Sequence, residues 1–437
     1  MTSSRSTSLT PDQRVVVTGW GMITSLGANV DDTFEAMRAG RSGVGRITRF
    51  DPTGLHCDIG AQIDVDALVE SHPMDVRGGT ELRLLRHAAK EALATAALDE
   101  IEDRHRIATC IGGHGRVPGR EVIQVMTRHA RDDGQVHVDA LRADPQFDAQ
   151  EFTTRSPDAA PTMLAHLLDA RGPVTPIVSA CAAGSQALGE GLRMLREGRA
   201  DVVVSGGAEP VLSFSYYLGF SLLGALTRRY PSPEAASRPF DRRRNGFVIG
   251  EGAGVLILET LAHARARGRT ILGEICGYGD SADGYRITDM HPKALGAVQA
   301  MRGAIADAGL TPDAIQYVNA HGTSTPINDP TETLACKTVF GERAYDVPIS
   351  SNKSMIGHTI GAAGAIEAIL SMKGMNEGVM LPTINQEAPD RRCDLDYVPN
   401  EAREAAHDVA LSNSFGFGGQ NACVCLGSAA GALREDD

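Results

Sequence analysis

The sequence predicts an α/β protein made of two similar halves, and three observations support this expectation. Apolar runs typical of buried strands alternate along the chain with stretches of helical periodicity. The same order of strand-like and helical stretches returns after about residue 266. At 437 residues, the chain is long enough for a large core shared by two domains or two fused halves. Such alternation predicts helices layered on central sheets.

The first half begins with a buried-strand pattern over residues 14–22, which runs into a glycine turn. Helical periodicity follows over residues 81–98, and residues 106–113 are again strand-like. Residues 175–195 pass from an apolar strand pattern through a group of small residues into a helix. A strand pattern over residues 200–209 completes this order of elements.

The second half repeats this order, with a weak similarity that depends more on order than on identity. The corresponding stretches are a strand at 270–279, a helix at 294–310, a strand at 315–323, a strand and helix at 347–370, and a strand at 408–419. We therefore expect two halves, residues 14–265 and residues 266–428. Connector-like stretches lie at 131–160 and 228–240, but no low-complexity linker divides the chain.

Composition and charge exclude several classes of protein. The net charge of −13 argues against a general nucleic-acid binder, because no excess of positive charge is left for phosphates. The eight cysteines include no CxxC pair and no zinc-like quartet, so we expect a reduced, cytoplasmic protein without a structural metal. No apolar run approaches the roughly twenty residues that span a bilayer. The polar first 13 residues lack the apolar segment of a signal peptide.

Cys181 lies where the strand of residues 175–195 passes into its helix. A helix presents unpaired N–H groups and a positive dipole end at its start, so we expect a thiolate there to be stabilised and its pKa lowered. The small residues at 182–185 would let a ligand or another backbone come close. A single such cysteine is more often a buried core residue, so other residues must support a catalytic role.

Two histidines supply that support. His321 follows a strand and precedes a Gly-Thr-Ser-Thr turn, and His358 lies just before a helix of small residues, five residues after Lys353. Junctions of this kind collect functional groups on α/β sheets. One cysteine with two histidines favours acyl transfer through a thioester, with the imidazoles as hydrogen-bond donors or proton carriers.

A glycine-rich stretch, NSFGFGGQNA at residues 413–422, completes the pattern. Its Gly-Phe-Gly-Gly turn leaves backbone N–H groups free to point at a ligand, as an oxyanion hole requires. Alone it would indicate only a glycine-rich hairpin.

These motifs together resemble the condensing enzymes, specifically β-ketoacyl-acyl-carrier-protein synthases of the type II kind. The resemblance depends on VSACAAGS, NAHGTSTPINDPTE, KSMIGHTIGAAGA, CDLDYVPNEAR and NSFGFGGQNA, and it runs from about Arg14 to Leu426. It implies a thiolase-like fold, in which two similar halves form a five-layered αβαβα core. It also implies an acyltransferase that joins an acyl group to a malonyl unit with loss of carbon dioxide.

The resemblance assigns roles to residues that match the family motifs. Cys181 corresponds to the acyl-accepting nucleophile, and His321 and His358 to the pair that supports decarboxylation. Lys353 corresponds to a lysine that orders the site, and we expect it to pair with Glu332.

The remaining roles concern the substrate. The N–H groups of Cys181 and Phe417 would form the oxyanion hole, and Phe417 would act as a gate. Thr323 and Thr325 would hydrogen-bond the phosphopantetheine arm, which arrives on the carrier protein, so no resident cofactor is expected. We also expect Phe415, Gly418 and Glu332 to contact the substrate.

The sequence argues against three other functions. A dinucleotide enzyme is suggested by the glycines at 250–254, but a strand pattern follows them where a Rossmann fingerprint needs a helix. A cysteine hydrolase would need an orienting Asn or Asp and has no use for a second histidine. A non-catalytic chain-length partner subunit would lack the nucleophile, so Cys181 argues against it.

Departures from the common family pattern favour a polyketide or unusual fatty-acid pathway over housekeeping elongation. The residues concerned are Ala182 and Ala183 after the nucleophile, Pro330, Asn352 and Gln420.

The carrier protein is expected to be acidic, so it should dock on a local basic patch. The candidates are Arg228–Arg229, Arg242–Arg244 and the arginines of residues 265–269. We also expect a dimer, because TPIVSA before Cys181 would be an apolar edge strand that needs a partner. The partner would be a second copy or a cysteine-less chain-length subunit; no nucleic acid or membrane partner is expected.

Overall fold

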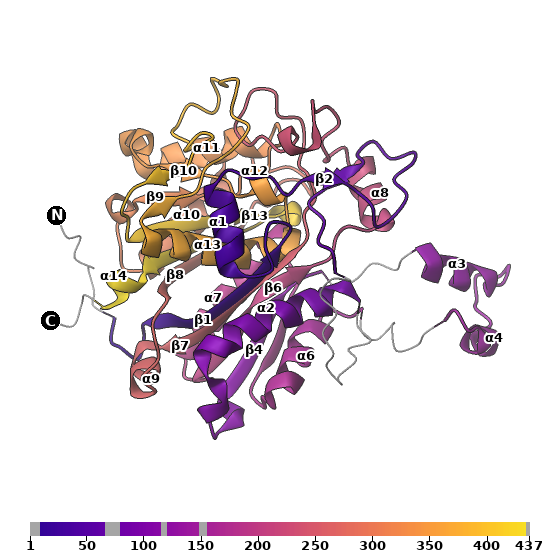
Figure 1. The fold of residues 1–437 in the computed structure, drawn as a ribbon, viewed down its shortest axis with the longest axis horizontal. Helices are drawn as coiled ribbons and strands as arrows, with labels where there is room; N and C mark the ends of the chain where they lie inside the picture. Colours follow the sequence, from indigo (N-terminus) through magenta and orange to yellow (C-terminus); the bar gives the residue numbers. More distant parts are fainter. Residues whose placement is uncertain (1–8, 66–78, 115–119, 148–154, 434–437) are drawn as a thin grey trace.

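A computed structural model of the protein describes residues 9–65, 79–114, 120–147 and 155–433 (Figure 1). The strands are β1 (Val15–Thr24), β2 (Gly45–Arg46), β3 (Ile59–Gly60), β4 (Ile107–Gly112), β5 (Val174–Ile177), β6 (Val202–Glu209), β7 (Gly252–Thr260), β8 (Gly273–Ala282), β9 (Tyr317–Asn319), β10 (Ile349–Ser350), β11 (Val379–Met380), β12 (Arg403–Glu404), β13 (Val409–Phe415) and β14 (Gln420–Ser428). The helices are α1 (Val30–Arg38), α2 (Thr80–Ala96), α3 (Arg120–Arg128), α4 (Val138–Ala143), α6 (Ala159–Leu168), α7 (Ala183–Arg196), α8 (Phe214–Leu222), α9 (Leu261–Ala266), α10 (Leu295–Asp307), α11 (Asn328–Phe340), α12 (Lys353–Ile356), α13 (Ala363–Glu377) and α14 (Ala429–Leu433).

Ten strands form one continuous sheet in the order β10-β9-β13-β14-β8-β1-β7-β6-β4-β5. Outward from the centre of the sheet, the strands of the first half are β1-β7-β6-β4-β5 and those of the second half are β8-β14-β13-β9-β10. In both halves, the first strand along the chain is innermost, and the fifth, fourth, second and third follow it. The two sets meet where β1 pairs antiparallel with β8, with Val15 opposite Ile275. The expected pair of similar halves is therefore confirmed at the level of strand order.

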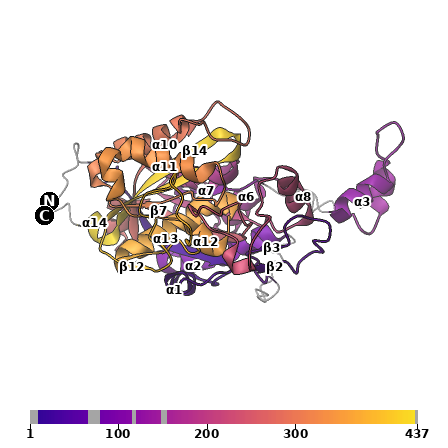
Figure 2. The ribbon, with the colours of Figure 1, turned by 90° about the horizontal axis from the view of Figure 1, so that it is seen from above.

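Helices cover and separate the two halves of this sheet in five layers. α2 and α6 pack on the first half, and α10 packs on β8 and β14 of the second, with α11 against α10. α7 and α13 contact strands of both halves and so form the central layer. Figures 1 and 2 show α7 and α13 inside the body, with α2 and α10 towards opposite sides. The five-layered αβαβα core implied by the family resemblance is confirmed.

The strands follow the apolar patterns of the sequence because the sheet is covered on both faces. All eight residues of β6 and the first eight of β7 are buried. Gly250 lies just before β7, and Gly252 and Gly254 already lie within β7, so this glycine stretch becomes a strand rather than a helix. The dinucleotide alternative therefore lacks its helix, as the sequence predicted.

The central helices contain glycine because their backbones come very close to each other. A Cβ at Gly184 of α7 would lie 2.8 Å from the carbonyl oxygen of Gly361, and one at Gly364 of α13 would lie 2.2 Å from Ser185 Oγ. Larger side chains at these positions would push the helices apart. This contact places the starts of α7 and α13 side by side, and the candidate site lies there.

The expected connector at 131–160 is partly wrong, since α4 and the beginning of α6 lie within it. Figures 1 and 2 show α3 and α4 standing to one side of the main body. Among the described residues, no helix is both long and apolar enough to cross a membrane.

Candidate active site

Cys181 lies in a 3-10 turn, Ala180–Ala182, between β5 and α7. Ala180 has φ of +50°, a left-handed conformation that an alanine adopts only at an energetic cost. This turn places Cys181 two residues before the start of α7. Cys181 is 4 % exposed and lines a small cavity of about 50 Å³.

His358 and His321 lie beside this thiol. His358 Nε2 is 3.0 Å from Cys181 Sγ, and the ring centroids of the two histidines are 5.2 Å apart at an angle of 82°. One side-chain atom from each of the three residues lies within 4.8 Å of the other two, and all three residues are buried. The structure thus brings together three residues that lie up to 177 positions apart in the chain.

The glycine-rich segment before β7 holds His358 in place. The N–H of His358 donates to the carbonyl of Val248 at 2.7 Å, and the N–H of Gly250 donates to the carbonyl of His358 at 2.9 Å. A Cβ at Gly250 would lie 2.1 Å from the carbonyl oxygen of Ile356, so the backbones can approach only because this residue is glycine. The glycines that suggested a nucleotide site therefore serve to position a histidine.

The backbone also selects the proton position on His358. The N–H of Ile360 donates to His358 Nδ1 at 3.3 Å, so Nδ1 is the acceptor and the neutral ring carries its proton on Nε2. The pKa of His358 and that of His321 lie well below the usual range because both rings are buried and Lys353 is close. A protonated Nε2 is a hydrogen-bond donor and has no lone pair for a metal. The cluster therefore suits stabilisation of a negatively charged oxygen better than metal binding.

The expectation that the pKa of Cys181 is lowered is wrong for the resting site. Burial raises the pKa of this thiol to about 12, and this effect outweighs the backbone N–H of Phe417 and the charge of Lys353, which both lower it. The start of a helix lowers the pKa of an exposed thiol, but burial in apolar surroundings raises it, and this thiol is buried. The resting site therefore holds a neutral thiol next to a neutral imidazole.

The N–H groups of Phe417 and Cys181 both lower the pKa of this thiol, which places both of them beside the sulfur. Phe417 follows β13 in a turn where Gly418 has φ of +83° and Gly419 has φ of +75°, so the turn requires glycine at both positions. The two donors agree with the expected oxyanion hole, whose role stays a prediction.

Lys353 pairs with Glu367 of α13, and the expected pairing with Glu332 is wrong. Glu332 is already occupied, because its carboxylate accepts the N–H groups of His321 and Gly322, each at 2.8 Å. It lies behind the His321 turn rather than in the cavity, and burial raises its pKa to about 7. Glu332 thus supports a histidine instead of a lysine.

Glu367 is the residue that sequence reasoning missed. Its carboxylate also accepts Asn319 Nδ2 at 3.2 Å, so it joins the lysine to the strand before His321. The available signal was a lone acidic residue in the otherwise apolar stretch GAAGAIEAIL. A buried charge in such a helix needs a partner of opposite sign, and Lys353 is a buried lysine nearby.

The cavity is lined by residues from both halves of the chain. They are Cys181, Phe247, Thr288, Asp289, Met290, His321, Thr323, Thr325, Ile327, Asn328, His358, Phe415, Gly416 and Phe417. Of the residues expected to contact substrate, Thr323, Thr325 and Phe415 are in this wall. Gly418 is not, and its N–H donates instead to the carbonyl of Ile287 at 2.6 Å.

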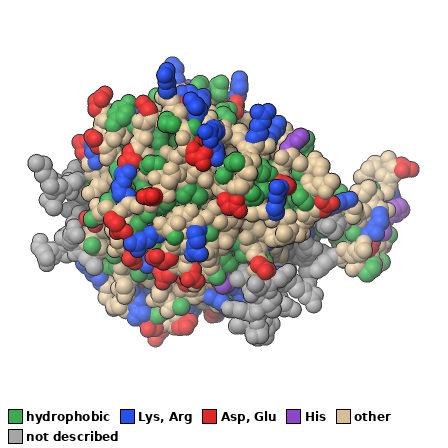
Figure 3. Space-filling model, turned by 45° about the horizontal axis from the view of Figure 1, so that its top comes forward, with side chains coloured by type: hydrophobic (Ala, Val, Ile, Leu, Met, Phe, Trp, Pro, Cys, Tyr) green, Lys and Arg blue, Asp and Glu red, His purple; other side chains and the backbone are tan. Residues whose placement is uncertain are grey.

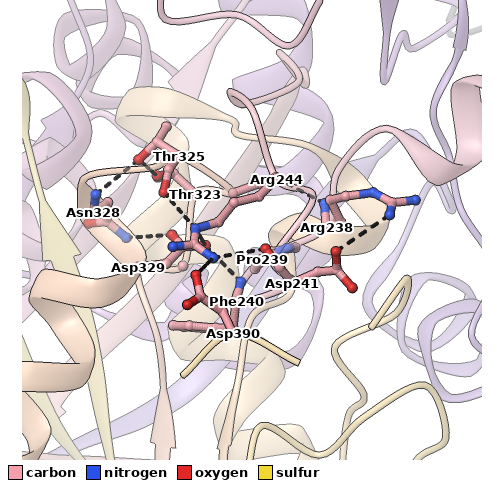
Figure 4. A network of polar contacts seen from close by, with 12 residues as sticks. Arg238, Pro239, Phe240, Asp241, Arg244, Thr323, Thr325, Asn328, Asp329 and Asp390 are labelled. Atoms are coloured by element: carbon pink, nitrogen blue, oxygen red, sulfur yellow. Dashed lines mark hydrogen bonds and ion pairs between the residues drawn. The ribbon is translucent and has the colours of Figure 1, made fainter. Parts of the chain in front are cut away.

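A buried arginine supports the threonine side of the wall (Figure 4). Arg244 Nε donates to the carbonyl of Thr325 at 3.0 Å, and its Nη1 donates to Asp390 at 2.8 Å. Thr323 Oγ1 and Thr325 Oγ1 lie 3.1 Å apart. Arg244 is 5 % exposed, so it cannot belong to a docking patch as the sequence suggested.

Comparisons with known proteins agree with this site. The family model "Beta-ketoacyl synthase, N-terminal domain" matches residues 12–264, and "Beta-ketoacyl synthase, C-terminal domain" matches residues 272–387. A 3-oxoacyl-[acyl-carrier-protein] synthase 2 from Synechocystis sp. is 40 % identical over 428 residues, covering 95 % of this chain and 98 % of the relative.

Solved structures of ketosynthases are also similar to this chain. A type II polyketide ketosynthase bound to a hexaketide, in complex with its acyl-carrier protein, superposes with a TM-score of 0.85 at 32 % identity. The ishigamide ketosynthase/chain length factor superposes with a TM-score of 0.82 at 33 % identity. Each alignment covers 95 % of this chain and 99 % of the other.

Proposed function

The chain belongs to the β-ketoacyl synthase family, and we propose that it catalyses decarboxylative condensation of an acyl group on Cys181 with a malonyl-acyl-carrier protein. The observation that carries this proposal is the placement of Cys181 Sγ 3.0 Å from His358 Nε2, with His321 beside both. Relatives and neighbours support condensation that depends on a carrier protein.

The first step is acyl transfer. Cys181 sulfur attacks the carbonyl of an acyl thioester on the carrier, and the N–H groups of Cys181 and Phe417 hold the tetrahedral oxyanion. A carbon–sulfur bond forms to Cys181, and the bond to the carrier's sulfur breaks. The resting thiol is neutral, so its proton is transferred to the carrier's sulfur as that sulfur leaves. The step therefore takes up and releases no proton.

The second step is decarboxylation and condensation. The malonyl thioester loses carbon dioxide, and negative charge builds on its carbonyl oxygen, where His358 Nε2–H and the His321 imidazole donate hydrogen bonds. The resulting carbanion attacks the acyl carbon on Cys181 and expels the sulfur, which takes up one proton. The product is a β-ketoacyl chain two carbons longer, still on the carrier's phosphopantetheine arm.

For the pathway, we propose a dissociated polyketide or unusual fatty-acid system. The polyketide ketosynthases among the structural neighbours and the departures at Ala182, Ala183, Pro330, Asn352 and Gln420 support it. Housekeeping fatty-acid elongation is the second candidate, favoured by the 40 % identity to a 3-oxoacyl synthase 2. A non-catalytic chain-length subunit is disfavoured by the assembled Cys-His-His cluster.

The carrier protein would dock near Arg242 and Arg243. Both are exposed, and they directly precede Arg244, which contacts Thr325 in the cavity wall. Figure 3 shows several Lys and Arg side chains along the upper edge of the molecule, with Asp and Glu side chains gathered lower on the same face. The arginines at 265–269 lie in and after α9, at the end of β7 far from the active site, and this position does not suit carrier docking.

We propose that β5 pairs with a partner chain. β5 is the last strand of the sheet, as the sequence predicted, and Val174 and Val178 are 41 % and 52 % exposed. An apolar open edge of this kind favours strand pairing across a two-fold axis. The partner is a second copy or a chain-length subunit; one neighbour is a ketosynthase/chain length factor. Light scattering on the protein alone should give a dimer mass, and a stable active monomer would contradict the proposal.

Mass spectrometry of carrier-bound products tests the reaction and the pathway together. Purified protein, malonyl-carrier protein and a range of acyl-carrier primers should give β-ketoacyl products two carbons longer than the primer. Reduced long chains among the accepted primers would favour elongation, and repeated extension without reduction would favour a polyketide system. No extension of any primer would reject the condensation.

A further inference from the structure

We propose that Asn328 is a further substrate-recognition residue, whose side-chain oxygen accepts a hydrogen bond from an amide N–H of the carrier's pantetheine arm. The inference rests on the proposed function and adds a residue to which the family resemblance assigned no role. It begins from a buried acceptor in the cavity wall that has no partner in the described part of the chain.

Hydrogen bonds fix the orientation of the Asn328 amide. Its Nδ2 donates to Asp329 Oδ1 at 3.1 Å and to Glu332 Oε2 at 3.4 Å. A carboxylate can only accept, so the NH₂ group must face these two side chains. Oδ1 is therefore directed away from both of them, on a residue that is 7 % exposed and lines the cavity.

This oxygen is costly to leave without a partner. A buried polar atom without a hydrogen bond loses the hydration that it would have in water, and most such atoms in folded proteins have a partner. The backbone of Asn328 is held as well, because its N–H donates to Thr325 Oγ1 at 3.1 Å. The acceptor is thus rigidly placed next to the threonine pair, as Figure 4 shows.

The wall matches both groups of a secondary amide. The hydroxyls of Thr323 and Thr325 can donate one hydrogen bond outward to a carbonyl oxygen, since a 3.1 Å bond between them uses only one of their two protons. Asn328 Oδ1 can accept the N–H of the same group. A pantetheine arm carries two secondary amides, and a free carboxylate would meet the acceptor Oδ1 and the Asp289 carboxylate in this wall. The wall therefore favours the neutral arm.

A chemical double-mutant cycle tests the proposal. Acyl-pantetheine thioesters would be prepared in which the N–H of one or the other arm amide is replaced by an ester oxygen. Acyl transfer to Cys181 would be measured with wild-type protein and with Asn328→Ala. With wild type, one of the two esters should raise KM by about three- to tenfold, with kcat within about twofold, as expected for one lost hydrogen bond.

The variant gives the decisive result. Asn328→Ala should raise KM for the amide substrate by the same factor, and the same ester should cause no further rise, because the shared hydrogen bond is already lost. Additive losses from the variant and from both esters would overturn the proposal, because they would show that Asn328 acts only on the structure of the site.

Two further variants control for folding. Asn328→Ser keeps a hydroxyl acceptor and should give an intermediate KM, which supports the proposal if the alanine variant does not fold. Asn376→Ala removes an exposed asparagine whose Nδ2 donates to the carbonyl of Leu272, outside the cavity wall, and should leave both parameters unchanged. Failure of wild type to accept acyl groups from any thioester would reject the proposed function itself, which is a different outcome from an additive cycle.

Discussion

The turns before α7 and α13 are equivalent in fold but carry different chemistry. Each is a 3-10 turn that leads into a helix, and the first residue of each turn is in the left-handed region, Ala180 at φ +50° and Ile360 at φ +47°. Cys181 occupies the position after the first of these residues, and Gly361 occupies it after the second. The second turn instead uses the Ile360 N–H to orient His358.

The surrounding residues explain why only the first turn can carry a nucleophile. A Cβ at Gly361 would lie 2.6 Å from Glu209 Oε2 and 3.0 Å from the Cα of Gly113. Beside Cys181 lies Gly416, which has no side chain, and a Cβ there would lie 3.3 Å from the Cys181 nitrogen. The residues that pack against each turn therefore decide whether it has room for a side chain. The first turn has room for the Cys181 thiol, whereas the position of Gly361 in the second turn has none.

Replacing the nucleophile should have the largest effect. Cys181→Ala removes the atom that accepts the acyl group, so condensation should fall by at least about a thousandfold in an assay of carrier-bound product. Cys181→Gln should still release carbon dioxide from malonyl-carrier protein, because the imidazole donors remain. Condensation at wild-type rate in Cys181→Ala would show that the first turn is not the reactive one.

The reactivity of the thiol tests whether the first turn activates it before substrate binds. With a pKa of about 12, the thiolate fraction of Cys181 increases about tenfold per pH unit below that value. Alkylation of Cys181 by iodoacetamide, followed by peptide mass spectrometry, should therefore accelerate by about that factor per unit from pH 7 to pH 10. A plateau near pH 8 would mean that the start of α7 does lower the pKa of this thiol, as the sequence suggested.

A methyl group in the second turn tests the packing argument. Gly361→Ala should lower the free energy of unfolding by about 1–3 kcal/mol, because the added carbon meets Glu209 and the backbone of Gly113. Chemical denaturation with activity as a second readout would measure this. Gly219→Ala is the matched control, since a Cβ at Gly219 meets nothing within 4 Å. Equal stability of both variants would contradict the account.

Charge reversal at the surface should have the smallest effect. Arg242→Glu with Arg243→Glu should raise KM for carrier protein several-fold at low salt and less at high salt, because exposed charges act mainly by steering. Arg265→Glu with Arg269→Glu is the control. α9 begins after the end of β7, and the nine residues of β7 separate it by roughly 27 Å from the start of that strand beside the active site. A salt-independent change, or an equal change in the control, would place docking elsewhere.

Local patterns in the sequence were enough for the alternation of strands and helices and for the three candidate catalytic residues, and the family resemblance supplied the five layers of the fold. Apolar runs and helical periodicity report burial directly, so the strands and the order of the halves could be read from them. Cys181, His321 and His358 each lie beside small residues at a junction, and five separate motifs in order made the assignment specific.

Only the tertiary structure decided which groups meet, because partners come from distant segments. Lys353 could have paired with either of two buried acids, and the hydrogen bonds of Glu332 to the His321 turn left Glu367 as its partner. The pKa of Cys181 depends on the exclusion of water by residues from both halves, which no local pattern encodes. The Asn328 side-chain oxygen, which has no partner among the described residues, likewise became visible only once its neighbours in space were known. A sequence specifies which groups are present, and their charge states and partners follow from the packing that surrounds them.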